Sequence, residues 1–172
     1  MIVTEDSLAS IIDGFPSIQI NSSTNLKPQF GWGDDKELNR YIALRKSKSY
    51  PLIWLLPSED LYEGSTGQSV VKECTFIIAT RETRTMLLNE ARYKASFAIV
   101  LNPLTDNLIK GLSSSNITSR SNSEYKIIKL PNYSDDEIKN GTIDLWDAIS
   151  LKIDIRFTNN LKNLKPIIYE NS

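Results

Sequence analysis

Hydrophobic residues near the N-terminus follow the spacing of a helix. Leu8, Ile11, Ile12 and Phe15 recur at intervals of three and four residues, which places them on one helical face. Gly14, close to the end of this stripe, is a residue that commonly ends helices. The pattern therefore predicts a short amphipathic helix, and a second short helix is predicted after Asp34.

A longer helical stripe begins near Thr85. Its members are Leu88, Ala91, Ala95, Ala98, Leu101, Leu104, Leu108 and Leu112. Steps of three or four residues predict one long helix with a continuous apolar face. We expect the three small alanines to let this helix lie close against a sheet, and we expect a kink or a break at Pro103.

Short apolar runs and period-two alternation predict strands. The run Leu52–Leu56 is apolar throughout, which is typical of a strand covered on both faces. Residues 70–81 alternate, so that Lys72, Cys74, Phe76 and Ile78 share one face. A further strand is predicted over residues 125–130, where proline follows.

The last strand has the clearest alternation. One parity holds Leu145, Ile149, Leu151, Ile153, Ile155 and Phe157, and the other holds Trp146, Ala148, Ser150, Lys152, Asp154 and Arg156. We expect the first set to face the core and the second to meet water or a neighbouring chain. On this interpretation Trp146 is exposed, and Asp154 and Arg156 form an ion pair between sheets or between subunits.

Polar stretches are interpreted as loops. Residues 57–69, 113–124 and 132–142 are rich in Ser, Asn, Asp or Gly, and residues 30–33 form a flexible aromatic corner around Trp32. The tail after residue 157 is weakly patterned, and Ile167-Ile168-Tyr169 is predicted to dock on another chain.

These elements predict a single domain over residues 1–172, with a core of about residues 7–157 and a C-terminal tail of residues 158–172. Strands and helices do not alternate regularly, which disfavours a doubly wound parallel sheet. We expect an α+β fold in which an antiparallel or mixed β-sheet is packed on one face by the long kinked helix.

Composition removes several function classes. The net charge is −1, without the basic excess that grips nucleic acid through its phosphates. Histidine is absent, which removes the commonest general base and metal ligand. The single cysteine, Cys74, is predicted to be a buried hydrophobe, and no signal peptide or membrane helix is expected.

Carboxylates cluster at residues 34–37, 59–63 and 135–137, beside turns or helix starts. Such groups hold Mg²⁺ when several converge, but at these places they more often cap helices and solvate loops. The nearest approach to a nuclease pattern is Asp60 followed by Lys72 and Glu73, whose side chains point to opposite faces of one strand. We predict no catalytic residue, no cofactor and no metal.

The remaining candidates are interface positions. Exposed tryptophans on strands mark interfaces, as do polar residues on long loops. The predicted interface residues are Trp32, Trp146, Glu59, Asp60, Tyr62, Asn116, Arg120, Asp154 and Arg156.

Three segments carry a resemblance to a known family. In order they are Tyr50–Pro57, Cys74–Thr80 and the helix that ends Leu101-Asn102-Pro103-Leu104. Together they resemble neck and tail-terminator ring proteins of tailed bacteriophages, particularly those of crAss-like phages, over about residues 7–157.

The resemblance implies a tail-terminator-like subunit without an active site. It implies a homo-oligomeric ring of six or twelve copies that joins portal, neck and tail proteins and lines a passage through which DNA moves without specific binding. The chain would then be a virion protein that is assembled in the cytoplasm of the bacterial host, without a membrane partner. Two alternatives stay open: a non-enzymatic cytoplasmic adaptor or small-ligand binding module, and a carboxylate-dependent metal enzyme.

Overall fold

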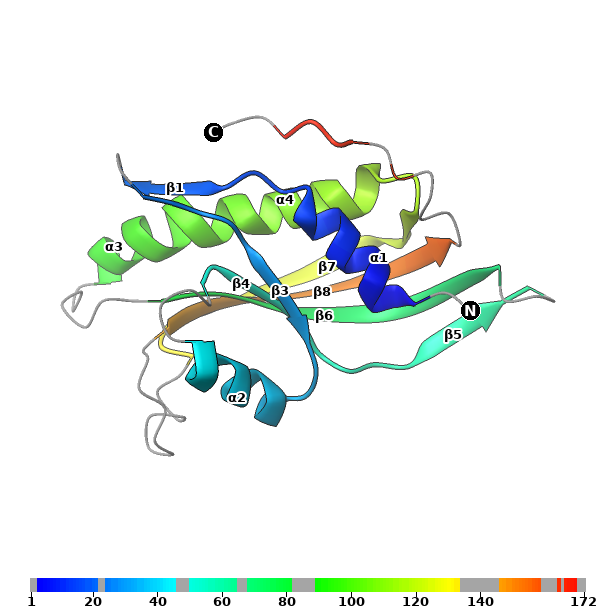
Figure 1. The fold of residues 1–172 in the computed structure, drawn as a ribbon, viewed down its shortest axis with the longest axis horizontal. Coiled ribbons are helices and arrows are strands. Elements are labelled where there is room, and N and C mark those ends of the chain that lie inside the picture. The colour runs from blue at the N-terminus through cyan, green and yellow to red at the C-terminus, as the bar shows by residue number, and fades with distance from the viewer. Residues whose placement is uncertain are drawn as a thin grey trace.

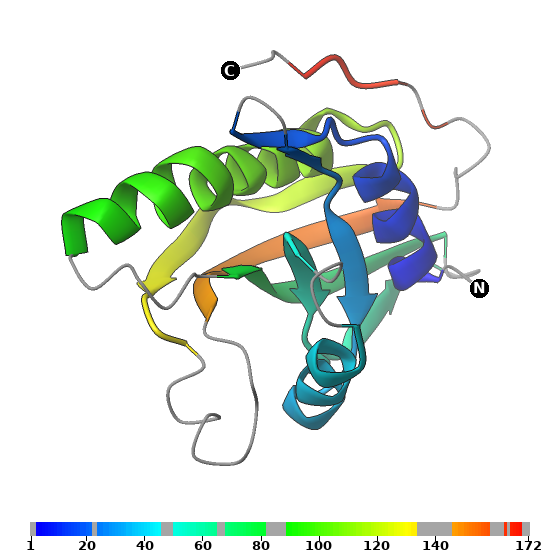
Figure 2. The same cartoon turned by 60° about the vertical axis from the view of Figure 1, so that its left-hand side comes forward.

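The computed structural model describes residues 3–21, 24–45, 50–64, 68–81, 89–133, 146–158, 164 and 166–169. Within these ranges the chain forms one main β-sheet between two layers of helices (Figure 1). The face of the sheet covered by α1 and the long helix is called the helix face below, and the opposite face is called the outer face. Figure 2 shows α2 on the outer side and the long helix across the other.

The helices are α1 (Thr4–Asp13), α2 (Asp35–Arg45), α3 (Asn89–Arg92), the π-helical segment η2 (Tyr93–Leu101) and α4 (Asn102–Ser114). The strands are β1 (Ile18–Asn21), β2 (Thr24–Leu26), β3 (Gln29–Trp32), β4 (Leu52–Leu55), β5 (Asp60–Glu63), β6 (Ser69–Arg81), β7 (Thr118–Leu130) and β8 (Trp146–Thr158). The last three helical segments follow one another without a gap, so they form one long helix.

The main sheet has the strand order β3-β4-β6-β8-β7, and β5 pairs with the part of β6 that β4 leaves uncovered. The pair β3–β4 is parallel and the other pairs are antiparallel. The longest ladder joins β6 to β8 from Ser69–Thr158 to Arg81–Trp146. The predicted α+β class with a mixed sheet is confirmed.

The main core lies between the helix face and the helices above it. As predicted, Leu8, Ile11 and Ile12 of α1 are buried there, together with Phe15 just after the helix. The even-numbered residues of β6 also face this core, and Cys74 is completely buried among them. These local alternation patterns were predicted correctly because each element buries one face only.

The long helix packs on the sheet through a different face from the one predicted. Ala91 and Ala98 are exposed, whereas Phe97 and Val100 are buried. The cause is η2: π-helical turns bond i to i+5 and are wider than α-turns, so they rotate the buried face along the sequence. After η2, the predicted stripe through Leu104, Leu108 and Leu112 is buried as expected.

Pro103 does not break the helix. It occupies the first turn of α4. In the first turn of a helix the backbone N–H groups have no α-helical partner, so proline loses no hydrogen bond by lacking one. The preceding amide, of Asn102, donates a hydrogen bond to the carbonyl of Phe97, five residues earlier. The π-helical segment therefore carries the chain into the proline turn without an end to the helix.

A second core lies on the outer face beneath α2. It consists of Leu38, Ile42, Tyr50, Leu52, Trp54, Ile77, Ala79, Trp146 and Ala148. The prediction that Trp146 is exposed is wrong, because its side chain is only 1% exposed and its ring meets that of Tyr133 at a centroid distance of 4.8 Å. This second core covers the end of the sheet where β8 begins. The first residues of β8 are therefore buried on both faces of the strand.

Three stretches predicted as loops contain strands. Residues 118–124 belong to β7, residues 60–63 form β5, and residues 29–32 form β3 beside β4. Thr118, at the start of β7, is buried and donates its hydroxyl to the carbonyl of Leu112. These segments form strands because the backbone groups of neighbouring strands are available for hydrogen bonding. Strand propensity, which depends on the local sequence, does not indicate such pairing.

Candidate assembly interface

β7 presents apolar side chains at one edge of the sheet. Tyr125, Ile127 and Ile128 are exposed by 42%, 43% and 58% respectively. β8 pairs with one side of β7, and no strand within the described residues pairs with the other side. Long edge strands with exposed apolar residues are templates for pairing with another chain. β7 is therefore the first candidate contact surface.

The register with β8 assigns the β7 side chains to faces. Tyr125, Ile127 and Lys129 lie opposite Ile153, Leu151 and Ile149, which belong to the main core, so all three lie on the helix face. The ammonium group of Lys129 lies 4.8 Å from the ring centroid of Tyr93 in η2. The intervening Lys126 and Ile128 lie on the outer face.

β5 presents a second apolar surface on the other side of the sheet. Leu61 is 65% exposed and lies on the outer face opposite Val71, and Tyr62 is 44% exposed and lies on the helix face opposite Val70. Only β6 pairs with β5 in the described part of the chain. Trp32, at the end of β3, is also exposed as predicted.

Seven of the predicted interface residues lie toward the end of the sheet formed by β5, the start of β7 and the end of β8. They are Glu59, Asp60, Tyr62, Asn116, Arg120, Asp154 and Arg156. Trp32 stands apart at the end of β3, and Trp146 is buried at the opposite end of β8. The exposed middle of β7 was not among the predicted interface residues.

The predicted ion pair between sheets or subunits has another partner. Arg156 binds Glu63 of the same chain, with a nitrogen-to-oxygen distance of 3.2 Å on the outer face. The two residues come from β8 and β5 of one sheet, and both side chains are partly exposed. The pair therefore stabilises the end of the sheet within one subunit, and the predicted location is wrong.

Arg120 marks an irregular part of β7. The pairing of β7 with β8 shifts register between Arg120 and Tyr125. The guanidinium group lies 5.2 Å from the ring centroid of Tyr125 and donates a hydrogen bond to the carbonyl of Ser123. These contacts hold the irregular segment against the regular half of β7, so Arg120 supports the strand rather than extending freely from a loop.

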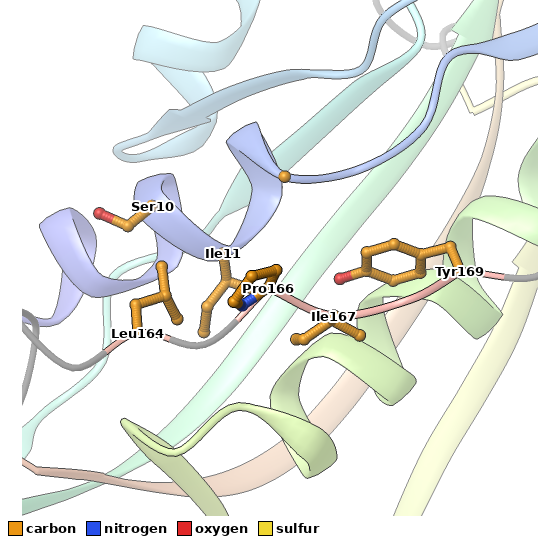
Figure 3. Close-up of a pocket in the computed structure, with 7 residues that line it drawn as sticks. Ser10, Ile11, Leu164, Pro166, Ile167 and Tyr169 are labelled. Carbon is orange, nitrogen blue, oxygen red and sulfur yellow. The ribbon is translucent and has the colours of Figure 1, made fainter.

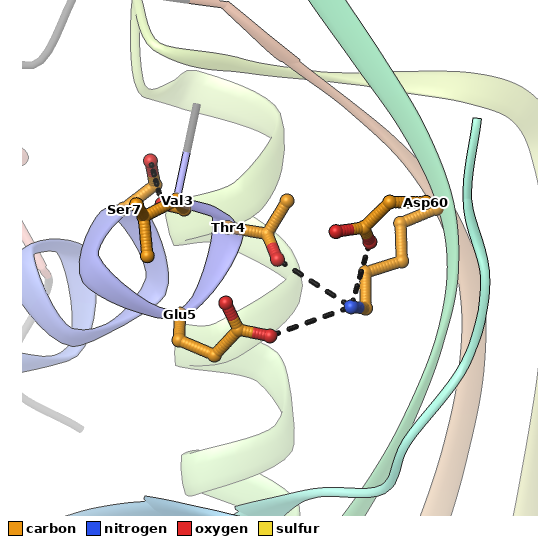
Figure 4. A network of polar contacts seen from close by, with 6 residues as sticks. Val3, Thr4, Glu5, Ser7 and Asp60 are labelled. Carbon is orange, nitrogen blue, oxygen red and sulfur yellow. Dashed lines mark hydrogen bonds and ion pairs between the residues drawn. The ribbon is translucent and has the colours of Figure 1, made fainter. Parts of the chain in front are cut away.

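β5 is anchored to β6 and α1 by the nearly buried Lys72. Its ammonium group lies 2.7 Å from Asp60 Oδ1, 3.4 Å from Glu5 Oε1 and 3.4 Å from Thr4 Oγ1 (Figure 4). Burial lowers the pKa of Lys72, but the hydrogen bond and charge of Asp60, together with Glu5, outweigh burial and raise that pKa above its ordinary value. Lys72 therefore stays charged and holds the start of β5 in place.

The remaining reactive groups have structural surroundings. Burial raises the pKa of the Cys74 thiol to about 12, which makes it a poor nucleophile. Asp34 accepts a hydrogen bond from the amide of Glu37, and Glu37 accepts one from the amide of Asp34, which is a capping box at the start of α2. Residues 135–137 lie outside the described residues. In the described ranges, no three acidic or thiol side chains gather as a metal site would require.

The C-terminal tail packs on its own chain. Tyr169 meets Phe15, which follows α1, at a ring centroid distance of 5.2 Å, and Ile168 is 85% exposed. Figure 3 shows Leu164 and Pro166 beside Ile11 of α1 and Tyr169 beyond the end of that helix, and these residues line a groove of about 250 Å³. The prediction that residues 167–169 dock on another chain is wrong for Tyr169, which this intramolecular contact occupies.

Replacing Tyr169 tests this tail contact. The hydroxyl of Tyr169 is buried without a hydrogen-bond partner among the described residues, and burial raises its pKa to about 12. Because an unsatisfied buried hydroxyl costs free energy, Tyr169→Phe is expected to leave stability unchanged or raise it by up to about 1 kcal/mol. Tyr169→Ala is expected to lower it by about 1–2 kcal/mol, because the ring is only partly buried. Urea unfolding of both variants measures the difference, and equal values would contradict the packed ring.

None of the helices in the described ranges is both long enough and apolar enough to cross a membrane. The chain matches no protein-family model and no curated protein sequence.

Proposed function

We propose that this chain is a structural virion protein that forms an oligomeric ring in the head-to-tail connector of a tailed phage. In this role it joins the portal to the tail and lines the passage for DNA. The observation that carries the proposal is the pair of exposed apolar surfaces, on β7 and on β5, at opposite sides of one sheet.

Two different surfaces on opposite sides of a subunit are what a ring requires. A heterologous contact joins one surface of a subunit to a different surface of its neighbour, and the ring closes when the rotation between neighbours divides a full turn. The mixed sheet under a long helix is compatible with the tail-terminator-like subunit that the sequence resembles. Six or twelve copies are the ring sizes that this resemblance implies.

The charge of the chain suits contact with moving DNA. A net charge of −1 provides no overall excess of cations to hold phosphates, so DNA would pass a ring of such subunits without being retained. The adjoining portal, neck and tail proteins would contact the ends of the sheet, and at one of these ends Glu59 is exposed and Asn116 is partly exposed. Assembly would take place in the cytoplasm of the host, and the mature location would be the virion neck.

Localisation in native virions tests this function. Antibodies against the chain are expected to label purified particles at the junction of head and tail, and mass spectrometry is expected to find the chain at six or twelve copies per portal. Antibodies adsorbed with the purified chain are the matched control. Absence of the chain from purified particles would overturn the proposal and favour the adaptor alternative.

A further inference from the structure

We propose that neighbouring copies join by antiparallel pairing of β7 of one copy with β5 of the next, so that their sheets become continuous. This inference rests on the proposed ring and names the contact that closes it. It follows from the directions, the faces and the charges of the two strands.

The strand directions permit the contact. β5, β8 and β4 all run antiparallel to β6, and β7 runs antiparallel to β8. β7 therefore runs with β6 and opposite to β5. When two copies stand side by side in the same orientation, β7 of one copy meets β5 of the next as an antiparallel pair, as a heterologous contact requires.

The faces of the two strands select a register. Side chains of directly opposed residues lie on the same face of a sheet. Ile128 and Leu61 both lie on the outer face, and Ile127 and Tyr62 both lie on the helix face. Pairing Ile128 with Leu61 therefore also pairs Ile127 with Tyr62, and four exposed apolar side chains cover one another across the contact.

The charges fit the same register. On the outer face Lys126 comes opposite Glu63, and on the helix face Lys129 comes opposite Asp60. Opposed unlike charges stabilise strand pairs, whereas like charges destabilise them. The edge of β5 is acidic and the regular half of β7 is basic, so unlike edges attract while two copies of either edge repel.

Other registers lose this match. A shift by two residues places Ile128 opposite Glu63 in one direction and Ile127 opposite Asp60 in the other, so an apolar side chain meets a charge. A shift by one residue sets outer-face side chains against helix-face side chains. Only the proposed register matches apolar residues with apolar residues and lysines with carboxylates.

The acidic partners already have contacts that leave room for a second cation. Asp60 binds Lys72 and Glu63 binds Arg156, yet the two carboxylate side chains are 28% and 38% exposed. A carboxylate has two oxygens and accepts several hydrogen bonds. Lys126 is exposed in the free subunit and makes no ion pair within the described part of the chain. Of the two lysines in the contact it therefore has more to gain from a partner, because Lys129 already lies over the ring of Tyr93.

Cysteine pairs in assembled virions test the register. The variants are Leu61→Cys with Ile128→Cys, and Tyr62→Cys with Ile127→Cys. Adjacent opposed pairs alternate between hydrogen-bonded and non-hydrogen-bonded sites, and side chains are closer at the latter, so at least one variant is expected to form intersubunit disulfides. The control, Leu61→Cys with Ile127→Cys, places the thiols on opposite faces and is expected to remain uncrosslinked. Cys74 can stay in place because it is buried.

Charge reversal provides an independent measurement. Lys126→Glu is expected to lower incorporation of the chain into virions by about tenfold or more, since like charges directly opposite one another destabilise a strand pair. Adding Glu63→Lys to that variant is expected to restore incorporation to within about threefold, provided that thermal unfolding shows an intact fold. Lys110→Glu, on an exposed position of α4, is the control and is expected to have no effect.

The outcomes separate the contact from the function. Wild-type rings in virions without crosslinks in either matched pair, and without rescue by Glu63→Lys, would overturn the strand contact and leave the proposed function standing. A wild-type chain that is missing from virions would overturn both. Crosslinks in the matched pairs alone, with rescue of the reversed charge, would support the contact and its register.

Discussion

Trp146→Ala is expected to lower the free energy of unfolding by about 3–5 kcal/mol, the range for removal of a buried aromatic side chain. Trp146 is 1% exposed within the second core, and its ring meets that of Tyr133 edge to face. Alanine would leave a cavity in the second core that the strands cannot fill without distortion. Urea unfolding followed by circular dichroism measures the loss.

Trp32→Ala is the matched control. Trp32 is 60% exposed, so its replacement is expected to change the free energy of unfolding by less than about 0.5 kcal/mol. The two variants remove the same side chain from sites that differ in burial. A small loss of unfolding free energy for Trp146→Ala together with a large loss for Trp32→Ala would contradict the burial described for these two residues.

Lys72→Ala is expected to lower the free energy of unfolding by about 2–3 kcal/mol. Removing one member of a buried ion pair usually costs about 3–5 kcal/mol, because the other charge loses its partner. The loss is smaller here because the side chains of Asp60 and Glu5 are 28% and 26% exposed, so water partly solvates them. Urea unfolding at neutral pH measures the change.

Lys72→Met keeps most of the volume and removes the charge. It is expected to cost less than Lys72→Ala, and the double variant Lys72→Met with Asp60→Asn is expected to recover part of the loss, because only Glu5 is then left as a carboxylate without its partner cation. If the two single variants at Lys72 lost equal stability, packing of the side chain would count for little. If Asp60→Asn gave no recovery, the charge pairing would be contradicted.

The contribution of the Lys72 charge to the free energy of unfolding changes with pH in a definite direction. Because folding raises the pKa of Lys72 above the ordinary value of 10.5, the folded state binds its proton more tightly than the unfolded state does. The stabilisation is complete below about pH 10, where lysine is charged in both states, and is lost as the pH rises through the folded pKa. The difference in unfolding free energy between wild type and Lys72→Met is therefore expected to be constant between about pH 7 and 10 and to shrink above that range.

The elements that depend on local alternation were accessible from the sequence. The buried face of α1, the even-numbered buried face of β6 and the burial of Cys74 follow from spacing within a few neighbouring residues. Periodicity suffices there because a helix or strand with one buried face repeats at 3.6 or 2 residues, whatever lies beyond it.

The candidate interface was accessible only in part. The exposure of Trp32 was predicted from its glycine flanks and is confirmed, whereas the acidic segment around Asp60 was predicted as a loop and forms β5. Ile127 and Ile128 were predicted to lie in a strand, but their exposure was not predicted. An apolar run does not indicate whether its strand lies at the centre or at the edge of a sheet. The order of strands decides that, and it is set by pairings between distant segments.

What the sequence determined by itself is the class of fold, the faces of its regular elements and the near-neutral charge. What the tertiary structure alone decided is the burial of Trp146 in the second core, the rotation of the buried face of the long helix by η2, and the placement of β5 and β7 at opposite edges. Each of these depends on contacts between residues far apart in the chain, where the free energy of packing and strand pairing outweighs the preference of any local segment.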